Sequence, residues 1–231
     1  MDAFDTVMHE LAKSGIAARA DICGKDCTSF KIGGRISVFC EPKNINELAS
    51  AIGIAESAGC RFFVIGNGSN LLIPDEGIEA VLIRPAGELT ESRIEGRTLF
   101  AGAGASLAAA AKASVAAGLM GLEWAGGIPG TIGGAVAMNA GAYGGEIKDV
   151  IKKVTVLKDG LVSAADVAPG DMGYRSSRFS FPDCVVLSAE FELQPDDGGA
   201  AARIREYNKK RREKQPVELP SAGSAFKRPE G

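Results

Sequence analysis

Two glycine-rich segments of this chain have the composition of a site where backbone approaches a ligand. In the first, VIGNGSNLLI (64–73), an apolar run is interrupted by five small or polar residues: Gly66, Asn67, Gly68, Ser69 and Asn70. Consecutive small residues allow several backbone N–H groups to point at one spot and hold a diphosphate, and the serine and asparagine side chains add hydrogen bonds. No helix is expected at its end, so it differs from the phosphate turn of a dinucleotide-binding βαβ unit. Taken alone, a tight β-turn with two permissive glycines is the better interpretation.

The second segment, Gly121–Gly145, reads GLEWAGGIPGTIGGAVAMNAGAYGG and contains one charged residue, Glu123. Its large apolar residues argue against a flexible linker, which would be polar and rich in serine. Glycine and alanine cannot build a core alone, so this backbone is expected to face a flat, partly apolar cofactor, such as an isoalloxazine ring with its diphosphate tail. The candidate contacts are Gly127, Ile128, Pro129, Gly130, Thr131, Gly133, Gly134, Ala135, Asn139, Gly141, Ala142 and Tyr143.

Composition indicates a globular protein that acts on a small molecule. The 231 residues are 45% hydrophobic and 24% charged, with 30 glycines and a formal net charge of −3, so no global field attracts nucleic acid. No apolar run is long enough to span a bilayer, and the acidic N-terminus is not a signal peptide. Five scattered cysteines favour reduced thiols and a cytoplasmic location. Cys23 and Cys27 lack a second ligand pair, so no metal site is predicted.

The expected elements form a small α/β unit at residues 17–85, after an amphipathic helix that ends at Gly15. Within the unit, residues 37–42, 61–66, 71–75 and 79–85 are expected strands, and a helix runs from the capping pair Asn44 and Glu47 to Gly59.

Beyond Pro85 we expect a hairpin at 93–104, an alanine-rich helix at 105–118, a hairpin at 152–166, a strand at 184–195 and a basic, solvated helix at 200–214. Gly102–Leu107 lacks the third glycine of a dinucleotide fingerprint, so a close strand-to-helix turn is the better interpretation. The fold class is α+β in two lobes.

Five further motifs occur in order along the chain beside the second glycine-rich segment. They are TSFKIGG (28–34), VIGNGSNLLI (64–73), FAGAGASL (100–107), MGYRSSRFS (172–180) and QPVELPSAGSAFKRPEG (215–231). Together they resemble the UDP-N-acetylenolpyruvoylglucosamine reductases (MurB). The absence of a long insertion after Tyr143-Gly144 is similar to the shorter, type II branch.

The resemblance implies a fold of the vanillyl-alcohol-oxidase/PCMH type, with FAD held between an N-terminal lobe (1–85) and a β-rich lobe (86–214). Residues 215–231 would then begin a C-terminal substrate-binding lobe. The only histidine is His9 and no cysteine lies within residues 61–183, so non-covalent FAD is expected. A bulky residue at Gly68 is expected to expel the flavin by closing the backbone to its diphosphate.

The implied reaction passes hydride from NADPH to the flavin and then to the vinyl carbon of UDP-N-acetylglucosamine enolpyruvate. By its motif, Arg175 would pair with the substrate carboxylate and its developing enolate charge. Ser224, in AGSAFK, would protonate the enolate carbon. Without the motif, both residues would be interpreted as ordinary loop residues.

The family continues well past this segment and carries a catalytic glutamate near its C-terminus. Neither Glu218 nor Glu230 lies in the matching motif, so neither takes that role, and this chain is expected to lack the C-terminal lobe. One alternative is therefore an FAD-binding fragment or degenerate member without full activity. Another is a flavin oxidase of the same fold that acts on a different alcohol or sugar, against which GSAFK and YRSSRF argue.

Overall fold

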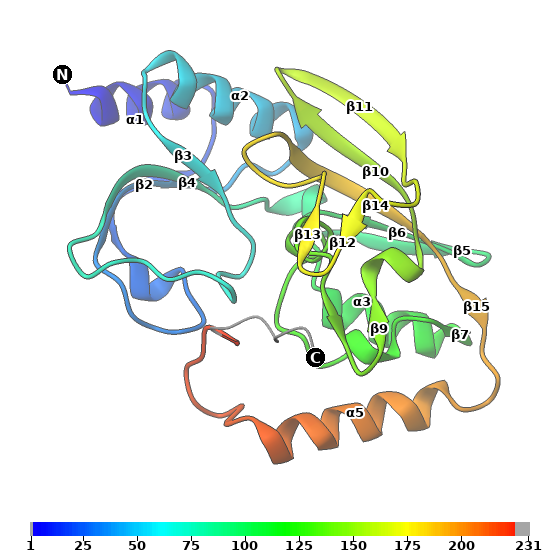
Figure 1. The fold of residues 1–231 in the computed structure, drawn as a ribbon. Helices are drawn as coiled ribbons and strands as arrows, with labels where there is room; N and C mark the ends of the chain where they lie inside the picture. The colour runs from blue at the N-terminus through cyan, green and yellow to red at the C-terminus, as the bar shows by residue number, and fades with distance from the viewer. Residues whose placement is uncertain (1, 225–231) are drawn as a thin grey trace.

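A computed structural model describes residues 2–224 of the chain, and Figure 1 shows its two sheets. Residues 3–83, called the first half of the fold below, form a four-stranded sheet in the order β1-β2-β4-β3. Its elements are α1 (Ala3–Lys13), β1 (Ala18–Cys23), η1 (Gly24–Asp26), β2 (Arg35–Cys40), α2 (Ile45–Ser57), β3 (Phe62–Val64) and β4 (Ile78–Ile83). Strand β1 is antiparallel to β2, whereas β2, β4 and β3 are mutually parallel. Parallel strands place their carboxyl ends at one edge of the sheet.

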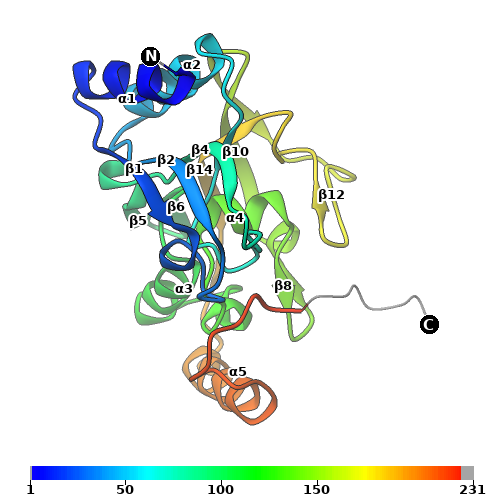
Figure 2. The ribbon, with the colours of Figure 1, turned by 90° about the vertical axis from the view of Figure 1, so that its left-hand side faces the viewer.

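The first two helices begin at side-chain caps that the local sequence supplies. In α1, Asp2 and Asp5 form a reciprocal capping box. The Asn44 side chain accepts the N–H of Glu47 at the start of α2. Both helices cover the same face of the first sheet, as Figures 1 and 2 show, and bury Val7 and Leu48 there.

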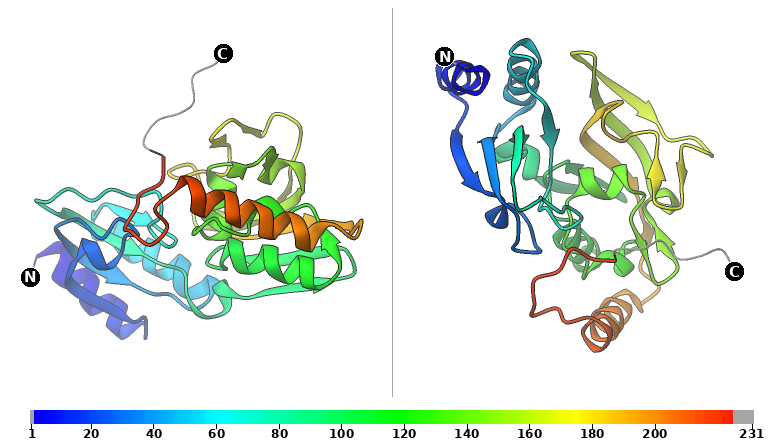
Figure 3. Two further views of the ribbon diagram at one scale, coloured as in Figure 1. Left: turned by 90° about the horizontal axis from the view of Figure 1, so that it is seen from below. Right: turned by 60° about the vertical axis from the view of Figure 1, so that its left-hand side comes forward.

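Residues 87–214, called the second half of the fold, form a five-stranded antiparallel sheet in the order β11-β10-β14-β6-β5. These strands are β5 (Ser92–Glu95), β6 (Thr98–Gly102), β10 (Ile151–Lys158), β11 (Leu161–Asp166) and β14 (Val185–Glu192). The helices are η2 (Gly87–Thr90), α3 (Leu107–Ala116), η3 (Glu123–Ala125), α4 (Ile132–Ala137), η4 (Ile147–Asp149) and α5 (Ala200–Lys214). This half also contains three two-stranded sheets: β7 (Leu119–Met120) with β15 (Gln194–Pro195), β8 (Gly141–Ala142) with β9 (Gly145–Glu146), and β12 (Met172–Gly173) with β13 (Ser176–Ser177). Helix α5 lies along the underside of the molecule (Figure 3).

The two halves share part of one core. Leu157, Val185 and Leu187 of the second sheet belong to the same buried cluster as α1 and α2. The division into lobes after residue 85 therefore stays a prediction, although it falls between the last strand of one sheet and the first of the other. Within residues 2–224, no helix is long and apolar enough to cross a membrane.

Most expected elements are confirmed, including all four long helices and both hairpins. The expected strand at 71–75 is wrong. Its chain is held instead by single bonds from the N–H groups of Gly34 and Gly77 to the Pro74 carbonyl, while Ile73 is buried against the segment after β1. Proline lacks the N–H that a ladder requires. The sequence analysis did not anticipate β1 or the short helix α4 inside the second glycine-rich segment.

Candidate functional site

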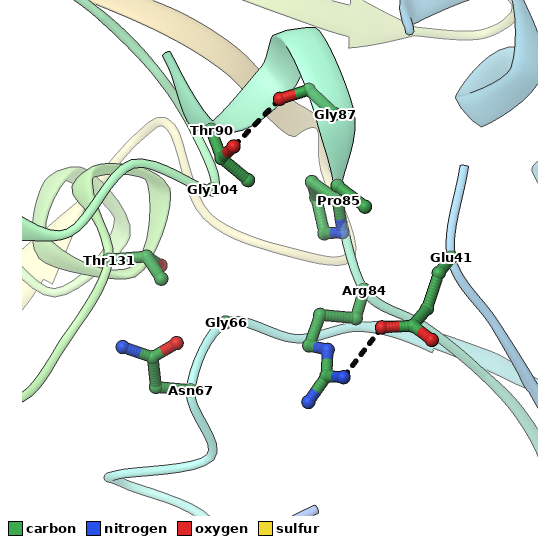
Figure 4. A pocket seen from close by; sticks show the side chains of 10 residues that line it. Glu41, Gly66, Asn67, Arg84, Pro85, Gly87, Thr90, Gly104 and Thr131 are labelled. Carbon is green, nitrogen blue, oxygen red and sulfur yellow. Dashed lines mark hydrogen bonds and ion pairs between the residues drawn. The ribbon is translucent and has the colours of Figure 1, made fainter. Parts of the chain in front are cut away.

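A pocket of about 230 Å³ lies at the carboxyl ends of β2, β4 and β3, against the start of the second half (Figure 4). It is lined by ten residues: Glu41, Gly66, Asn67, Arg84, Pro85, Ala86, Gly87, Thr90, Gly104 and Thr131. Ligands of open α/β sheets bind outside the carboxyl ends of parallel strands, where the following loops diverge. This position therefore marks the pocket as the candidate ligand site.

The first glycine-rich loop lines this pocket with Gly66 and Asn67 and carries unused backbone donors. Across the described chain, none of the five N–H groups from Gly66 to Asn70 donates a hydrogen bond to a protein acceptor. Their loop is held by other atoms, since the Asn67 amide donates to the Pro129 carbonyl at 3.2 Å and the Gly68 carbonyl accepts from the Ser29 N–H. Backbone donors left without partners are costly unless water or a ligand accepts from them. An anionic diphosphate suits such a run.

Thr131 closes the other side of the pocket against the loop. A β-carbon added at Gly66 would lie 2.3 Å from the Thr131 hydroxyl, so only glycine allows this approach. The N–H groups of Gly130 and Thr131 also have no acceptor within residues 2–224. The first N–H groups of α4 are different, because Ile132 and Gly133 donate to carbonyls of the β6–α3 turn. Unused donors therefore lie at the corner before α4 and not at its first turn.

Gly68 has a different reason to be glycine from the one expected. Its φ is +62°, and an added β-carbon would lie 2.1 Å from the carbonyl oxygen of Cys27. The missing side chain thus faces the segment after η1, which packs against the loop from behind. A substitution there breaks protein packing, while its effect on the diphosphate space stays a prediction.

Arg84 is a lining residue that the sequence analysis missed. Its guanidinium donates to Glu41 at 2.6 Å and lies 4.8 Å from the ring centre of Phe39. Arg19 also pairs with Glu41, at 3.6 Å, and lies over the same ring. Two cations beside one carboxylate leave a net positive charge next to the pocket, which favours an anionic ligand. Its position directly after an expected strand is the sequence signal by which it could have been found.

The second glycine-rich segment uses several of its glycines to approach protein. Added β-carbons at Gly126 and Gly127 would meet Ile204 at 2.5 Å and Asn208 at 2.6 Å, both on α5. At Gly145 an added β-carbon would lie 2.3 Å from the Trp124 ring. Gly133 similarly packs on Ala103. The expectation that this whole segment faces a cofactor is therefore too broad.

The structure brings only part of that segment to the first loop. Pro129 accepts from Asn67, Gly130 lies close to Ser69, and the Asn70 amide lies 3.9 Å from the Met138 sulfur. The remaining candidates lie in α4, in its flanking turns or in β8 and the turn that follows it: Ile128, Gly134, Ala135, Gly141, Ala142 and Tyr143.

Tyr143 lies at a second cavity. Its ring stacks on Tyr207 of α5, with ring centres 4.7 Å apart and planes at 5°. Both line a space of about 330 Å³ that also contains Trp124 and Arg203. The guanidinium of Arg203 is bound to Glu123, so this region anchors α5 to η3.

Asn139 is fully buried and its side chain is committed to the protein. The amide nitrogen donates to the Gly173 carbonyl at 2.8 Å and to Glu146 at 3.1 Å, and the amide oxygen accepts from the Lys148 N–H at 3.0 Å. Each of its polar side-chain atoms thus has a protein partner, and its contact with a cofactor stays a prediction.

Arg175 lies at the turn between β12 and β13, with φ +54°. Its guanidinium donates to the carbonyls of Asn139, at 3.3 Å, and Gly141, at 2.8 Å. The nearby Glu146 carboxyl has a lowered pKa, chiefly because Lys148 bonds to it, with further help from Asn139 and Arg175 against the effect of burial. The Glu146 carboxyl near Arg175 is thus ionised at neutral pH.

Ser224 is exposed at the end of a segment that returns to the first glycine-rich loop. Ser221 exchanges two hydrogen bonds with Ser29, and an added β-carbon at Gly223 would lie 3.8 Å from the Ser69 carbonyl oxygen. No protein group within residues 2–224 bonds to the Ser224 hydroxyl. The rest of the AGSAFK motif lies outside the described residues.

Comparisons with known proteins agree with this geometry. The FAD binding domain family matches residues 36–163. A UDP-N-acetylenolpyruvoylglucosamine reductase of Alkaliphilus oremlandii is 43% identical over 209 residues, which are 90% of this chain and 69% of that protein. The corresponding protein of Caldicellulosiruptor bescii is 41% identical over 224 residues, 95% of this chain and 71% of the relative.

Solved structures extend the same result. The reductase (MurB) of Thermus caldophilus aligns with a TM-score of 0.78 and 32% identity, covering 93% of this chain and 75% of that one. Cholesterol oxidase of Brevibacterium sterolicum, at 17% identity and a TM-score of 0.57, shares the fold alone. The predicted α+β, FAD-binding fold class is confirmed. The chain belongs to the UDP-N-acetylenolpyruvoylglucosamine reductase family of FAD-binding proteins.

Proposed function

We propose that this chain is an FAD-binding oxidoreductase that reduces UDP-N-acetylglucosamine enolpyruvate to UDP-N-acetylmuramate with NADPH. This reaction belongs to peptidoglycan precursor synthesis, and we propose a cytoplasmic location for it. Family membership supports the activity. The cofactor assignment rests on the five N–H groups of Gly66–Asn70, which have no protein acceptor within residues 2–224, in a loop whose Gly66 and Asn67 line the pocket at the carboxyl ends of three parallel strands.

The loop at Gly66–Asn70 would hold the diphosphate of FAD through its backbone donors. Arg84 adds positive charge at the edge of the same pocket, and Thr131 adds a further free N–H from the opposite side. The proposed attachment is non-covalent, because the only histidine of the sequence is His9, on α1, and no cysteine occurs within residues 61–183. When bound, FAD supplies the hydride transfer between NADPH and the enolpyruvyl group.

Arg175 would bind the carboxylate of the enolpyruvyl group and stabilise charge that develops on it. A guanidinium has five N–H donors, and Arg175 donates two of them to the Asn139 and Gly141 carbonyls. The remaining three suffice for a bidentate carboxylate pair. Ser224, whose hydroxyl bonds to no protein group within residues 2–224, would deliver the proton to the substrate carbon.

The proposal is tested by two anaerobic measurements on the FAD-loaded enzyme. NADPH should bleach the flavin absorbance, and UDP-N-acetylglucosamine enolpyruvate should then restore it. In Ser224→Ala, bleaching should persist while restoration becomes slow. Bleaching that the enolpyruvate cannot reverse in the wild-type enzyme would contradict the proposed substrate. Protein that stays colourless with excess FAD would contradict the cofactor site.

A further inference from the structure

We propose that Asn139 is a positioning residue that holds Arg175 in place for the substrate carboxylate. The inference rests on the proposed function, because it assumes that Arg175 meets that carboxylate. It assigns to Asn139 no contact with substrate or cofactor. Its part is to fix the tip of the β12–β13 hairpin against the turn that follows α4.

The hairpin that carries Arg175 is too short to fix its own tip. Strands β12 and β13 pair over two residues each, and Figure 2 shows the hairpin projecting from the body of the molecule. Two-stranded ribbons of this size are marginal in water without outside support. Met172 and Phe179 are buried and anchor the base. The turn itself needs a separate tether.

Asn139 supplies this tether from a fully buried position. Its amide nitrogen donates to the Gly173 carbonyl, two residues before Arg175, and its own carbonyl accepts from the Arg175 guanidinium. The amide oxygen meanwhile accepts from the Lys148 N–H. One residue therefore joins the α4 turn, the β9–η4 segment and the hairpin.

Asparagine suits this position for a backbone reason as well. Asn139 has φ +41°, a region that asparagine enters more readily than most other residues with a β-carbon. The left-handed turn directs its carbonyl to one side and its side chain into the core. Both the side-chain and the main-chain contacts thus depend on the same local conformation.

The Arg175 guanidinium is consequently held at two of its nitrogen atoms, at 3.3 and 2.8 Å from carbonyl oxygens. Loss of the Asn139 side chain frees the Gly173 end and lets the turn move. A displacement of about 1 Å at a group that stabilises a transition state can slow a reaction roughly a hundredfold. The expected loss is therefore in reaction rate and not in cofactor binding.

The test is Asn139→Gly in the FAD-loaded enzyme, because glycine accepts φ +41° without strain and removes only the side chain. We expect the rate of flavin reoxidation by the enolpyruvate to fall about tenfold to a hundredfold, much more than the rate of reduction by NADPH. Asp159→Gly is the matched control, since Asp159 has φ +49° at an exposed hairpin turn. Equal losses in both variants would overturn the proposal.

A double-mutant comparison separates positioning from general destabilisation. If Asn139 acts through Arg175, Asn139→Gly should add almost nothing to the slow reoxidation of Arg175→Ala. Losses that multiply would overturn the inference while leaving the function of Arg175 in place. If Arg175→Ala reoxidises at the wild-type rate, the proposed part of Arg175 fails and the inference falls with it.

Should Asn139→Gly fail to fold, Asn139→Asp serves as the second variant. Aspartate keeps the shape and the acceptor for Lys148 but loses both donors, including the one to Gly173. Slow reoxidation with normal FAD content is again expected. A wild-type rate in this variant would overturn the proposal, because it would show that the bond to Gly173 is dispensable.

Discussion

The two glycine-rich regions of this chain look alike in sequence but are used differently. In Gly66–Asn70 no N–H group has a protein acceptor among residues 2–224. In Gly121–Gly145 four of the nine glycines bring backbone against α5, Trp124 or the turn after β6, and Gly121 and Gly141 approach other protein atoms. In this segment Thr131 lines the pocket, and neither its N–H group nor that of Gly130 has an acceptor in the described part of the chain.

This difference teaches that glycine content alone does not identify a phosphate site. A glycine whose missing side chain faces protein reports close packing, as Gly127 does beside α5. A backbone donor without an acceptor reports space for a ligand or water. The lack of acceptors arises because the loop follows the carboxyl end of a strand, and composition does not reveal that position.

The largest expected effect is in Gly68→Ala, which tests whether the first loop also depends on packing. The left-handed backbone and the contact with the Cys27 carbonyl together should lower the free energy of unfolding by about 2–5 kcal/mol. Urea unfolding of the FAD-free protein measures this. Gly59→Ala is the control, because Gly59 has φ +68° with open space around it, so it isolates the backbone strain. A stable, merely colourless Gly68→Ala protein would restore the diphosphate explanation.

Gly66→Ala should be next, since it attacks the contact between the two regions. The added methyl group would lie 2.3 Å from the Thr131 hydroxyl and force the pocket walls apart. Overpacking of this kind costs about 1–3 kcal/mol, so FAD affinity should fall roughly tenfold or more. Titration of apoprotein with FAD, followed by fluorescence, measures the affinity. In the control Gly130→Ala the nearest atom is 3.7 Å away, and affinity should remain.

Sequence patterns were sufficient to predict the four long helices and the hairpins β5–β6 and β10–β11, because these depend on local signals. The Asn44 cap, the Asp159-Gly160 turn and the spacing of Val7 and Leu11 all act within a few residues. The strand at 71–75 failed because an apolar run with a proline has no ladder partner available to it. Its buried Ile73 packs through tertiary contacts that periodicity cannot show.

The site could be predicted only where one continuous segment builds it. The loop at Gly66–Asn70 was found in this way, whereas Arg84 comes from a different strand and becomes a neighbour only when the parallel sheet forms. The tie between Asn139 and the Arg175 turn joins residues 36 positions apart. The second glycine-rich segment and the MGYRSSRFS motif are thus joined by hydrogen bonds that residue spacing in the sequence does not predict.

Arg84→Ala tests whether charge at the strand ends adds to the backbone donors of the first loop. A hydrogen bond to a charged group contributes roughly 1.5–3 kcal/mol when buried, and Arg84 is partly exposed, so FAD affinity should fall about tenfold. High salt should reduce the difference. Arg19→Ala is a matched control, since Arg19 shares Glu41 and Phe39 but does not line the pocket. Equal losses in the two variants would mean that Arg84 acts only through that cluster.

Gly127→Ala should have the smallest effect and is the sharpest test of the comparison. The sequence places Gly127 among the cofactor contacts, but its added methyl group would meet only the Asn208 oxygen and the Arg211 chain, both on side chains that can move. Substitutions of this kind usually change stability by less than about 0.5 kcal/mol, and FAD affinity should be unchanged. Gly126→Ala next to it would press on the buried Ile204 and should lower stability by about 1–3 kcal/mol without affecting FAD. If Gly127→Ala instead loses the flavin while Gly126→Ala keeps it, the second region binds cofactor along its whole length, and the distinction between the two regions is wrong.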